Sequence, residues 1–294
     1  MDAVWSAAVG LSDNSQEEMD GYDLVVAIGD VLLKRDRDNP ALRERMAEAL
    51  VNKGFRLGAL NRSEEAVTVY DEVVQRFGEA TEPAVREQVA KALVNKGFRL
   101  GALNWSEEEV AVYDEVVQRF GEATEPAVRE RVARALFNKG FRLGGLNRSE
   151  EEVAVYDEVV QRFGEATEPA VREVVGRSLN DIGFAFLYDA KRMWAAGDEP
   201  AARDRLFRAE EKLRVGLNRA PDNPVILGNL GYAAFLSGRV DEARELLGRA
   251  IRLGGEELRQ AALDDAAIHP LPQDEAFKEL VRSIPGPETE VEEE

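Results

Sequence analysis

Apolar residues recur at steps of three and four along most of the chain, which is the spacing of a buried helical stripe. One such stripe runs from about residue 83 to 103 and consists of Val85, Val89, Leu93, Gly97, Leu100 and Leu103. A second stripe follows and consists of Val110, Tyr113, Val116, Val117 and Phe120. No segment alternates apolar and polar residues over a sustained run. The pattern therefore predicts pairs of helices and no sheet.

The helix pair belongs to a unit that recurs every 43 residues, because ALVNKGFRLGALN begins at Ala49 and Ala92, and ALFNKGFRLGGLN begins at Ala135. A proline stands near the start of the first helix of a pair, where a missing N–H is harmless; these prolines are Pro83, Pro126 and Pro169. An asparagine ends the first helix, at Asn61, Asn104 and Asn147. Two residues later a serine is expected to be the N-cap of the second helix; these serines are Ser63, Ser106 and Ser149.

Weaker copies flank the three near-identical units, as expected for an array whose terminal units face water. We predict a degenerate N-terminal repeat or cap at 1–39, repeats at 40–82, 83–125, 126–168, 169–220 and 221–254, a C-terminal helical cap at 255–284, and an acidic, disordered tail at 285–294. The fourth repeat carries about seven more residues between Gly183 and Gly197, which predicts roughly two extra helical turns.

The stretch from Asn52 to Tyr70 reads N-x-G-x-x-L-x-x-x-N-x-S-x-x-A-x-x-x-Y and resembles the tetratricopeptide repeat. A period of 43 lies nearer the HEAT or armadillo range, since the tetratricopeptide unit has 34 residues. The residues favour the tetratricopeptide pattern, so we place about nine extra residues in a longer first helix. The resemblance covers about residues 15–254. It implies an all-α, right-handed superhelical solenoid of antiparallel helix pairs, in which Gly54 of a first helix faces Ala66 of a second.

Two units carry a glutamate, Glu109 or Glu152, at the position of Ala66. A buried carboxylate without a partner would be strongly unfavourable. Each glutamate stands three residues after a serine, Ser106 or Ser149. We therefore expect capping boxes, in which the carboxylate folds back onto the start of its own helix.

Opposite the buried stripe, each first helix carries a second row of residues on one face. In the second unit this row includes Lys91, Asn95 and Phe98. The resemblance implies that first helices line a concave groove, with a phenylalanine from each unit, an asparagine beside it and a basic residue one turn earlier. The expected peptide- or partner-binding residues are Asn52, Phe55, Lys91, Asn95, Phe98, Arg134, Asn138, Phe141, Arg177, Asp181, Phe184 and Tyr188.

This row suits a peptide, because an asparagine amide both donates and accepts hydrogen bonds and a phenylalanine ring adds apolar contact area. The basic line Lys91, Arg134 and Arg177 could hold a carboxylate. Carboxylate-clamp members of the family bind C-terminal tails of chaperones with asparagines and basic residues at such positions. Glu48 occupies the basic position of the first unit, which argues against a full clamp. The alternative is that the phenylalanines pack against the first helix of the neighbouring unit.

The 294 residues have a net charge of −19, no cysteine and one histidine, His269. Such an excess of acidic residues disfavours binding to nucleic-acid phosphates. The sequence contains no glycine-rich phosphate loop, metal-ligand cluster or nucleophile–base pair. We therefore expect no enzyme, no catalytic residue, no cofactor and no metal.

The first residues do not resemble a secretory signal, and no apolar run approaches membrane-spanning length. We expect a soluble, cytoplasmic protein that contacts neither membrane nor nucleic acid. The predicted function is a protein–protein interaction scaffold that binds a peptide or partner protein in its groove. The alternative is a homo-oligomerisation module that stacks through its terminal repeats.

Overall fold

The computed structural model describes residues 16–286, and over this range the chain forms twelve helices and no strand. The prediction of an all-α repeat solenoid is confirmed for these residues. The chain divides into two compact units, residues 1–148 and 149–294. Most of the tail expected to be disordered, and the first fifteen residues of the expected N-terminal repeat, lie outside the described residues.

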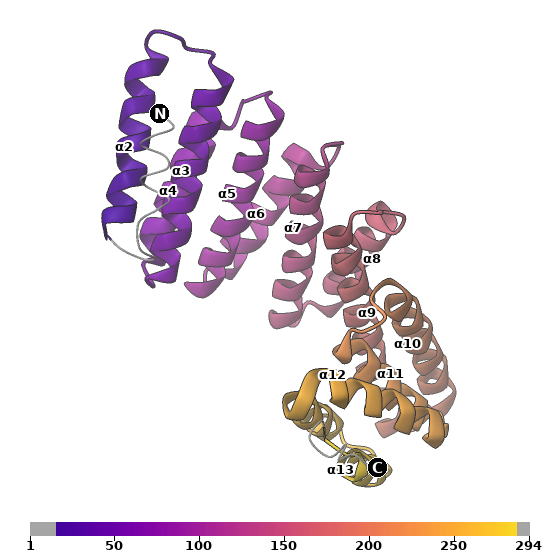
Figure 1. Ribbon diagram of the computed structural model, residues 1–294. Helices are drawn as coiled ribbons and strands as arrows, with labels where there is room; N and C mark the ends of the chain where they lie inside the picture. The colour runs from indigo at the N-terminus through magenta and orange to yellow at the C-terminus, as the bar shows by residue number, and fades with distance from the viewer. Residues whose placement is uncertain (1–15, 287–294) are drawn as a thin grey trace. The chain divides into compact units, whose positions relative to one another are not determined.

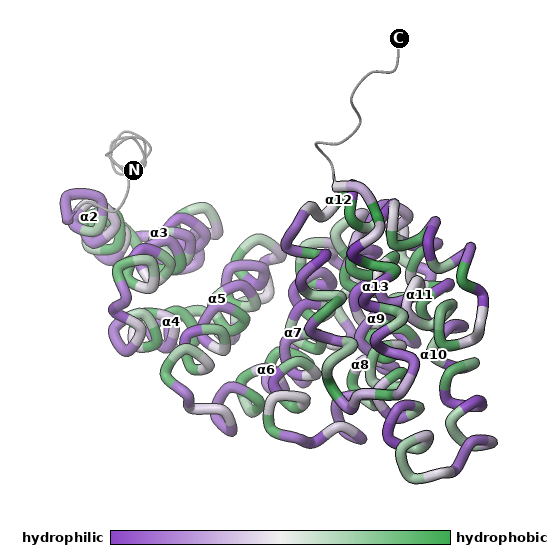
Figure 2. The backbone as a smooth tube through the Cα atoms, turned by 90° about the horizontal axis from the view of Figure 1, so that it is seen from below, coloured by the Kyte–Doolittle hydropathy of each residue, from purple (hydrophilic) through white to green (hydrophobic). Residues whose placement is uncertain are grey.

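The first unit contains α2 (Gln16–Leu33), α3 (Pro40–Ala59), α4 (Ser63–Phe77), α5 (Pro83–Ala102), α6 (Ser106–Phe120) and α7 (Pro126–Gly145). Each second helix, α4 or α6, packs on the first helix of its own repeat and on the first helix of the next (Figure 1). The first helices α3, α5 and α7 also pack on one another. Hydrophobic stretches alternate with hydrophilic ones along the helices of this unit, as the helical stripes require (Figure 2).

A glycine in each first helix allows the second helix to approach closely. A Cβ atom at Gly54 would lie 2.6 Å from Cε1 of Tyr70, and one at Gly97 would lie 2.5 Å from the same atom of Tyr113. Both tyrosine side chains are fully buried. The atoms nearest to Gly54 thus belong to Tyr70, not to Ala66 as the family pattern implied, because the tyrosine ring fills the space that the missing side chain leaves.

Lysine–aspartate ion pairs recur along the first unit, one between each first helix and the helix before it. Each joins a lysine of a first helix to an aspartate of the preceding helix: Lys53–Asp23 at 2.5 Å, Lys96–Asp71 at 2.5 Å and Lys139–Asp114 at 2.6 Å. The aspartate side chains are more than half exposed, so each pair stabilises the fold only weakly. Their regular spacing reflects the register between successive repeats.

A left-handed asparagine closes each first helix of the near-identical repeats. Asn104 has φ 61°, and the N–H of Trp105 donates to the carbonyl of Leu100 at 3.0 Å, which satisfies the last turn of α5. The expectation that Ser106 is the N-cap is wrong, because Ser106 is the first residue of α6 and Trp105 holds the cap position without a side-chain hydrogen bond. The turn is so short that Trp105, whose N–H bonds the last turn of α5, is also the N-cap residue of α6.

The second unit contains α8 (Ser149–Phe163), α9 (Pro169–Ala195), α10 (Glu199–Arg219), α11 (Pro224–Leu236), α12 (Val240–Ala267) and α13 (Asp274–Ser283). Helix α9 has 27 residues where α3, α5 and α7 have 20 each, so the insertion lengthens this helix. Helix α12 runs across the expected boundary between repeat and cap. Its backbone leaves helical values at Gly255, with φ 65° and ψ −157°, so the following segment changes direction and α13 packs against it.

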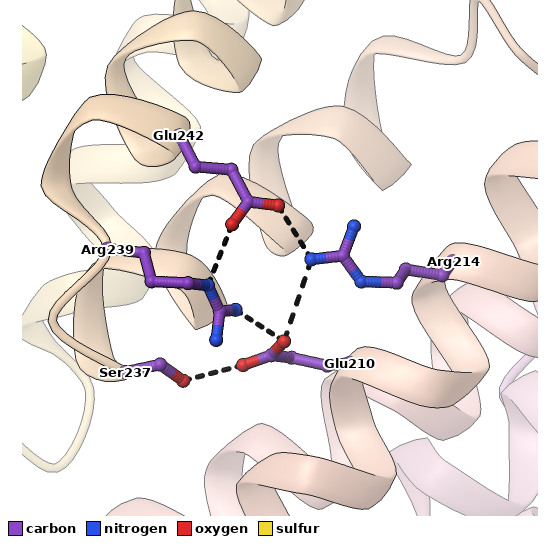
Figure 3. A network of polar contacts seen from close by, with 5 residues as sticks. All are labelled: Glu210, Arg214, Ser237, Arg239 and Glu242. Atoms are coloured by element: carbon purple, nitrogen blue, oxygen red, sulfur yellow. Dashed lines mark hydrogen bonds and ion pairs between the residues drawn. The ribbon is translucent and has the colours of Figure 1, made fainter.

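A ring of ion pairs joins α10 to the turn between α11 and α12 and to the first turn of α12 (Figure 3). The Glu210 carboxylate accepts hydrogen bonds from Arg239 and from the Ser237 hydroxyl. Glu242 accepts from Arg214 at 2.6 Å and from Arg239 at 2.7 Å. Because each arginine contacts both carboxylates, the network holds the fourth helix pair against the fifth.

Candidate peptide-binding surface

Three first helices present a phenylalanine to solvent at the same register. The exposed fractions of Phe55, Phe98 and Phe141 are 51%, 59% and 67%. Helices α3, α5 and α7 pack on one another and on the second helices through other residues, so these rings are open to solvent and not sealed between repeats. We call Phe55, Phe98 and Phe141 the aromatic row; Phe184 on α9 (Pro169–Ala195) is their counterpart in the second unit.

An asparagine lies one turn before each phenylalanine of the first unit and is half-buried. Asn138 hydrogen-bonds the hydroxyl of Tyr113, and Asn95 lies beside the hydroxyl of Tyr70. Burial raises the pKa of Tyr70 to about 12, and Asn95 opposes that rise. An amide has two donor and two acceptor sites. The contact with tyrosine therefore leaves most of the hydrogen-bonding capacity of each asparagine for a ligand.

The basic residues expected one turn earlier have three different environments. Arg134 pairs with Glu130 on its own helix at 2.9 Å. Lys91 forms no ion pair with any residue in the range 16–286 and is half-buried. Arg177 is exposed. Burial raises the pKa of Asp181, and the charge of Arg177 opposes that rise. The three residues therefore differ in their electrostatic surroundings.

The sequence-based expectation of a capping box at Glu109 is wrong. Its carboxylate, only 5% exposed, pairs with the guanidinium of Arg142 on α7 and does not return to the start of α6. Burial raises the pKa of Glu109, and Arg142 opposes that rise. Gly101 makes the arrangement possible, because a Cβ atom there would lie 2.6 Å from the Glu109 Oε2 atom. A buried charge thus pairs with a second charge from the next repeat.

In the second unit, the last two expected site residues lie together on α9. The rings of Phe184 and Tyr188 pack at 4.5 Å between centroids. Both line a cavity of about 70 Å³ formed by α9, α11, α12 and α13. The apolar walls also include Leu187, Val225, Leu258 and Phe277. The Tyr188 hydroxyl is buried without a hydrogen-bond partner in the described residues, so it could bond an incoming polar group.

A buried ionic cluster closes one side of this cavity. Lys191 is 1% exposed; its ammonium donates to the carbonyl of Ala266 at 3.0 Å and pairs with Asp274 at 3.3 Å. The Tyr232 hydroxyl donates to the same carboxylate at 2.6 Å. Burial lowers the pKa of Lys191, and Asp274 opposes that change. Sequence reasoning missed this cluster, because a lone lysine in a helix has no signal that distinguishes it from a solvated one.

Two features of the described residues bear on other classes of function. No group of three or more histidine, aspartate or glutamate side chains in the range 16–286 is arranged to hold a metal ion. No helix in the same range combines the length and the apolar character needed to cross a membrane.

No protein-family model and no curated protein matches the chain. Among solved structures, BtubC (BKLC) from P. vanneervenii is similar over 86% of this chain and 93% of its own, with a TM-score of 0.57 and 15% identity. The nearly identical TPR-like repeats of a putative kinesin light chain from Podosopora anserina match over 74% of this chain and 98% of theirs, with a TM-score of 0.49 and 16% identity. YrrB, a TPR protein with an unusual peptide-binding site, matches over 80% and 97%, with a TM-score of 0.45 and 14% identity.

At these identities the likeness concerns the fold alone. Helix pairs stacked through a glycine–tyrosine contact, repeated along the first unit, agree with it. The described residues have the all-α helical-repeat fold that the sequence predicted.

Proposed function

We propose that this protein is a protein–protein interaction scaffold that binds a peptide or partner protein along the exposed face of its first helices. The observation that carries the proposal is the exposure of Phe55, Phe98 and Phe141 at one register. A phenylalanine left in water forgoes roughly 1.5–3 kcal/mol of burial. Aromatic side chains with polar neighbours are typical anchors of protein interfaces.

The residues beside the aromatic row give the face its polar part. Asn95 and Asn138 have free amide donors and acceptors for a peptide backbone. Lys91 has a positive charge that no residue in the range 16–286 neutralises by an ion pair. The proposed binding residues are Asn52, Phe55, Lys91, Asn95, Phe98, Arg134, Asn138, Phe141, Arg177, Asp181, Phe184 and Tyr188.

The test is a pull-down with the intact chain and three variants. Phe98→Ala/Phe141→Ala removes two rings of the row, and Asn95→Ala/Asn138→Ala removes two amides. Phe207→Ala is the matched control, because Phe207 on α10 is 69% exposed and lies outside the row. We expect both double variants to lose partners that the intact chain and the control retain. Equal retention by all four proteins would show that binding takes place elsewhere.

The alternative function is assembly through the terminal repeats. Leu24 and Val31 on α2 are 51% and 57% exposed, which leaves apolar side chains on the first described helix. Light scattering over a concentration series tests this alternative. A mass that rises with concentration, and that falls back to one chain in Leu24→Ser/Val31→Ser, supports assembly, whereas a constant monomer mass contradicts it.

A further inference from the structure

Helix α9 departs from the three preceding first helices at two positions of one site. The amide position holds Asn52, Asn95, Asn138 and then Asp181, and the position four residues later holds Arg56, Arg99, Arg142 and then Ala185. The fourth repeat thus gains a carboxylate and loses a guanidinium in the same helical turn. Both changes make the site more negative.

The lost arginine has a defined role in the earlier repeats. Arg56 pairs with Glu18 at 3.0 Å, and Arg142 pairs with Glu109. Both carboxylates are almost fully buried, at 2% and 5% exposure. A carboxylate at this position of the second helix is therefore held by a guanidinium from the following first helix in both described cases.

The phenylalanine of the aromatic row forms the other wall of this guanidinium position. The Arg99 guanidinium carbon lies 5.0 Å from the centroid of the Phe98 ring, and that of Arg56 lies 5.9 Å from the centroid of Phe55. These distances are within the range of cation–π attraction. At Arg56 the ring and the carboxylate hold the same guanidinium, so this position suits a planar cation.

In the fourth repeat the carboxylate and the phenylalanine recur at the same sequence positions, while the arginine is replaced. Glu152 on α8 occupies the position of Glu109, and Phe184 keeps the ring. Asp181 adds a second carboxylate, to which the Tyr156 hydroxyl hydrogen-bonds, and its charge acts on Glu152. Arg177, one turn earlier on α9, attracts Asp181. It does not occupy the repeat position of Arg142, which in α9 is Ala185. Glu152 and Asp181 are both partly accessible to solvent.

We infer that Glu152 and Asp181 bind the guanidinium of an arginine from a bound peptide, against Phe184, at the position that Arg142 fills in the preceding repeat. This inference rests on the proposed scaffold function and names one residue of the ligand. A guanidinium suits the site better than an ammonium, because it is planar, stacks on an aromatic ring and donates to two carboxylates at once. The chain's net charge of −19 also attracts a basic peptide.

Ethylguanidinium is the probe for a direct test on the full chain. We expect saturable ¹³C shifts at the Glu152 and Asp181 carboxyl carbons and at the Phe184 ring, with butylammonium producing weaker ones. Two variants compare this site with the equivalent site of the preceding repeat, which Arg142 fills. Ala185→Arg fills the position and abolishes the response, whereas Arg142→Ala vacates the earlier site and creates a new response at Glu109.

The inference is overturned if Glu152 and Asp181 do not respond, if Ala185→Arg leaves the response intact, or if shifts of equal size appear at acidic residues all over the surface. A random hexapeptide library on phage, selected against the intact chain and against Ala185→Arg, gives a second readout. Arginine enriched only on the intact chain supports the inference, and arginine enriched on neither or on both contradicts it. These readouts need no natural partner, so their failure leaves the pull-down with the Phe98 and Phe141 variants as the separate test of the scaffold function.

Discussion

Gly97 of α5 lies so close to Tyr113 of α6 that a Cβ atom added to the glycine would stand 2.5 Å from the tyrosine ring. Gly97→Ala must therefore push apart two helices or displace a buried ring, and we expect it to lower the free energy of unfolding by about 1–3 kcal/mol. Gly145→Ala is the control, because nothing lies within 4 Å of the Cβ position there. Gly145→Ala should raise stability by about 0.4–1 kcal/mol, because alanine lowers the conformational entropy of the unfolded chain and meets no other atom at this last residue of α7. Equal effects in urea unfolding would contradict the close-packing argument.

Asn104 has φ 61° between α5 and α6, a conformation that strains a side chain with a Cβ atom. Asparagine tolerates it, and glycine adopts it freely. We expect Asn104→Ala to lower the unfolding free energy by about 1 kcal/mol and Asn104→Gly to leave it nearly unchanged. If both substitutions lower the urea midpoint equally, the lost side chain and not the backbone conformation is responsible.

Burial and the charge of Asp181 raise the pKa of Glu152 to about 7. The folded state therefore binds a proton more tightly than the unfolded state, so the stabilisation is complete below the unfolded pKa and is lost as the pH rises through 7. Burial also raises the pKa of Asp181, although Asn180, Tyr156 and Arg177 oppose that rise. Asp181 therefore also makes the folded state less stable as the pH rises. We expect the unfolding free energy to fall by about 1–3 kcal/mol between pH 4.5 and 7.5, with solvent screening favouring the lower figure.

Glu152→Gln should remove most of that pH dependence, because the neutral amide does not titrate. Thermal unfolding at several pH values, for the intact chain and for Glu152→Gln, measures the difference. Parallel curves for the two proteins would rule out Glu152 as the group responsible.

Lys191 and Asp274 form an ion pair in which both side chains are almost completely buried, at 1% and 2% exposure. Lys191→Met leaves the carboxylate without its cation, and we expect a loss of about 3–5 kcal/mol. The Lys212–Asp157 pair, at 2.8 Å with both side chains more exposed, is the matched comparison. Lys212→Met should change stability by less than about 1 kcal/mol. If chemical denaturation shows similar losses of unfolding free energy for the two variants, burial does not determine the cost of removing the lysine.

Much of the fold could be predicted from the sequence because the unit is repeated. A stripe such as Val85, Val89 and Leu93, seen at the same spacing in successive units, makes chance periodicity implausible. The asparagine that closes each first helix was recognisable for the same reason. The serine caps were not, because the sequence does not reveal that the turn after Asn104 places the cap position on Trp105.

The polar contacts between repeats were harder to predict. The sequence offers Glu109 a local partner at the start of α6 and a distant one in Arg142, and only the packing of α6 on α7 decides for Arg142. The cluster of Lys191, Asp274 and Tyr232 joins residues from three helices far apart in the chain, so no local spacing reveals it. The aromatic row followed from helical geometry, but the openness of its rings depends on which faces the neighbouring helices cover.

The most direct test of the central claim measures whether a partner covers the aromatic row. In protein labelled with 4-fluorophenylalanine, a soluble gadolinium reagent should broaden the ¹⁹F signals of Phe98 and Phe141 strongly and leave that of the buried Phe77 sharp. We predict that a partner captured by the intact chain protects Phe98 and Phe141 from broadening while Phe207 on α10 stays accessible. Protection of Phe207 alone, or unchanged broadening of the row with partner bound, would contradict the account.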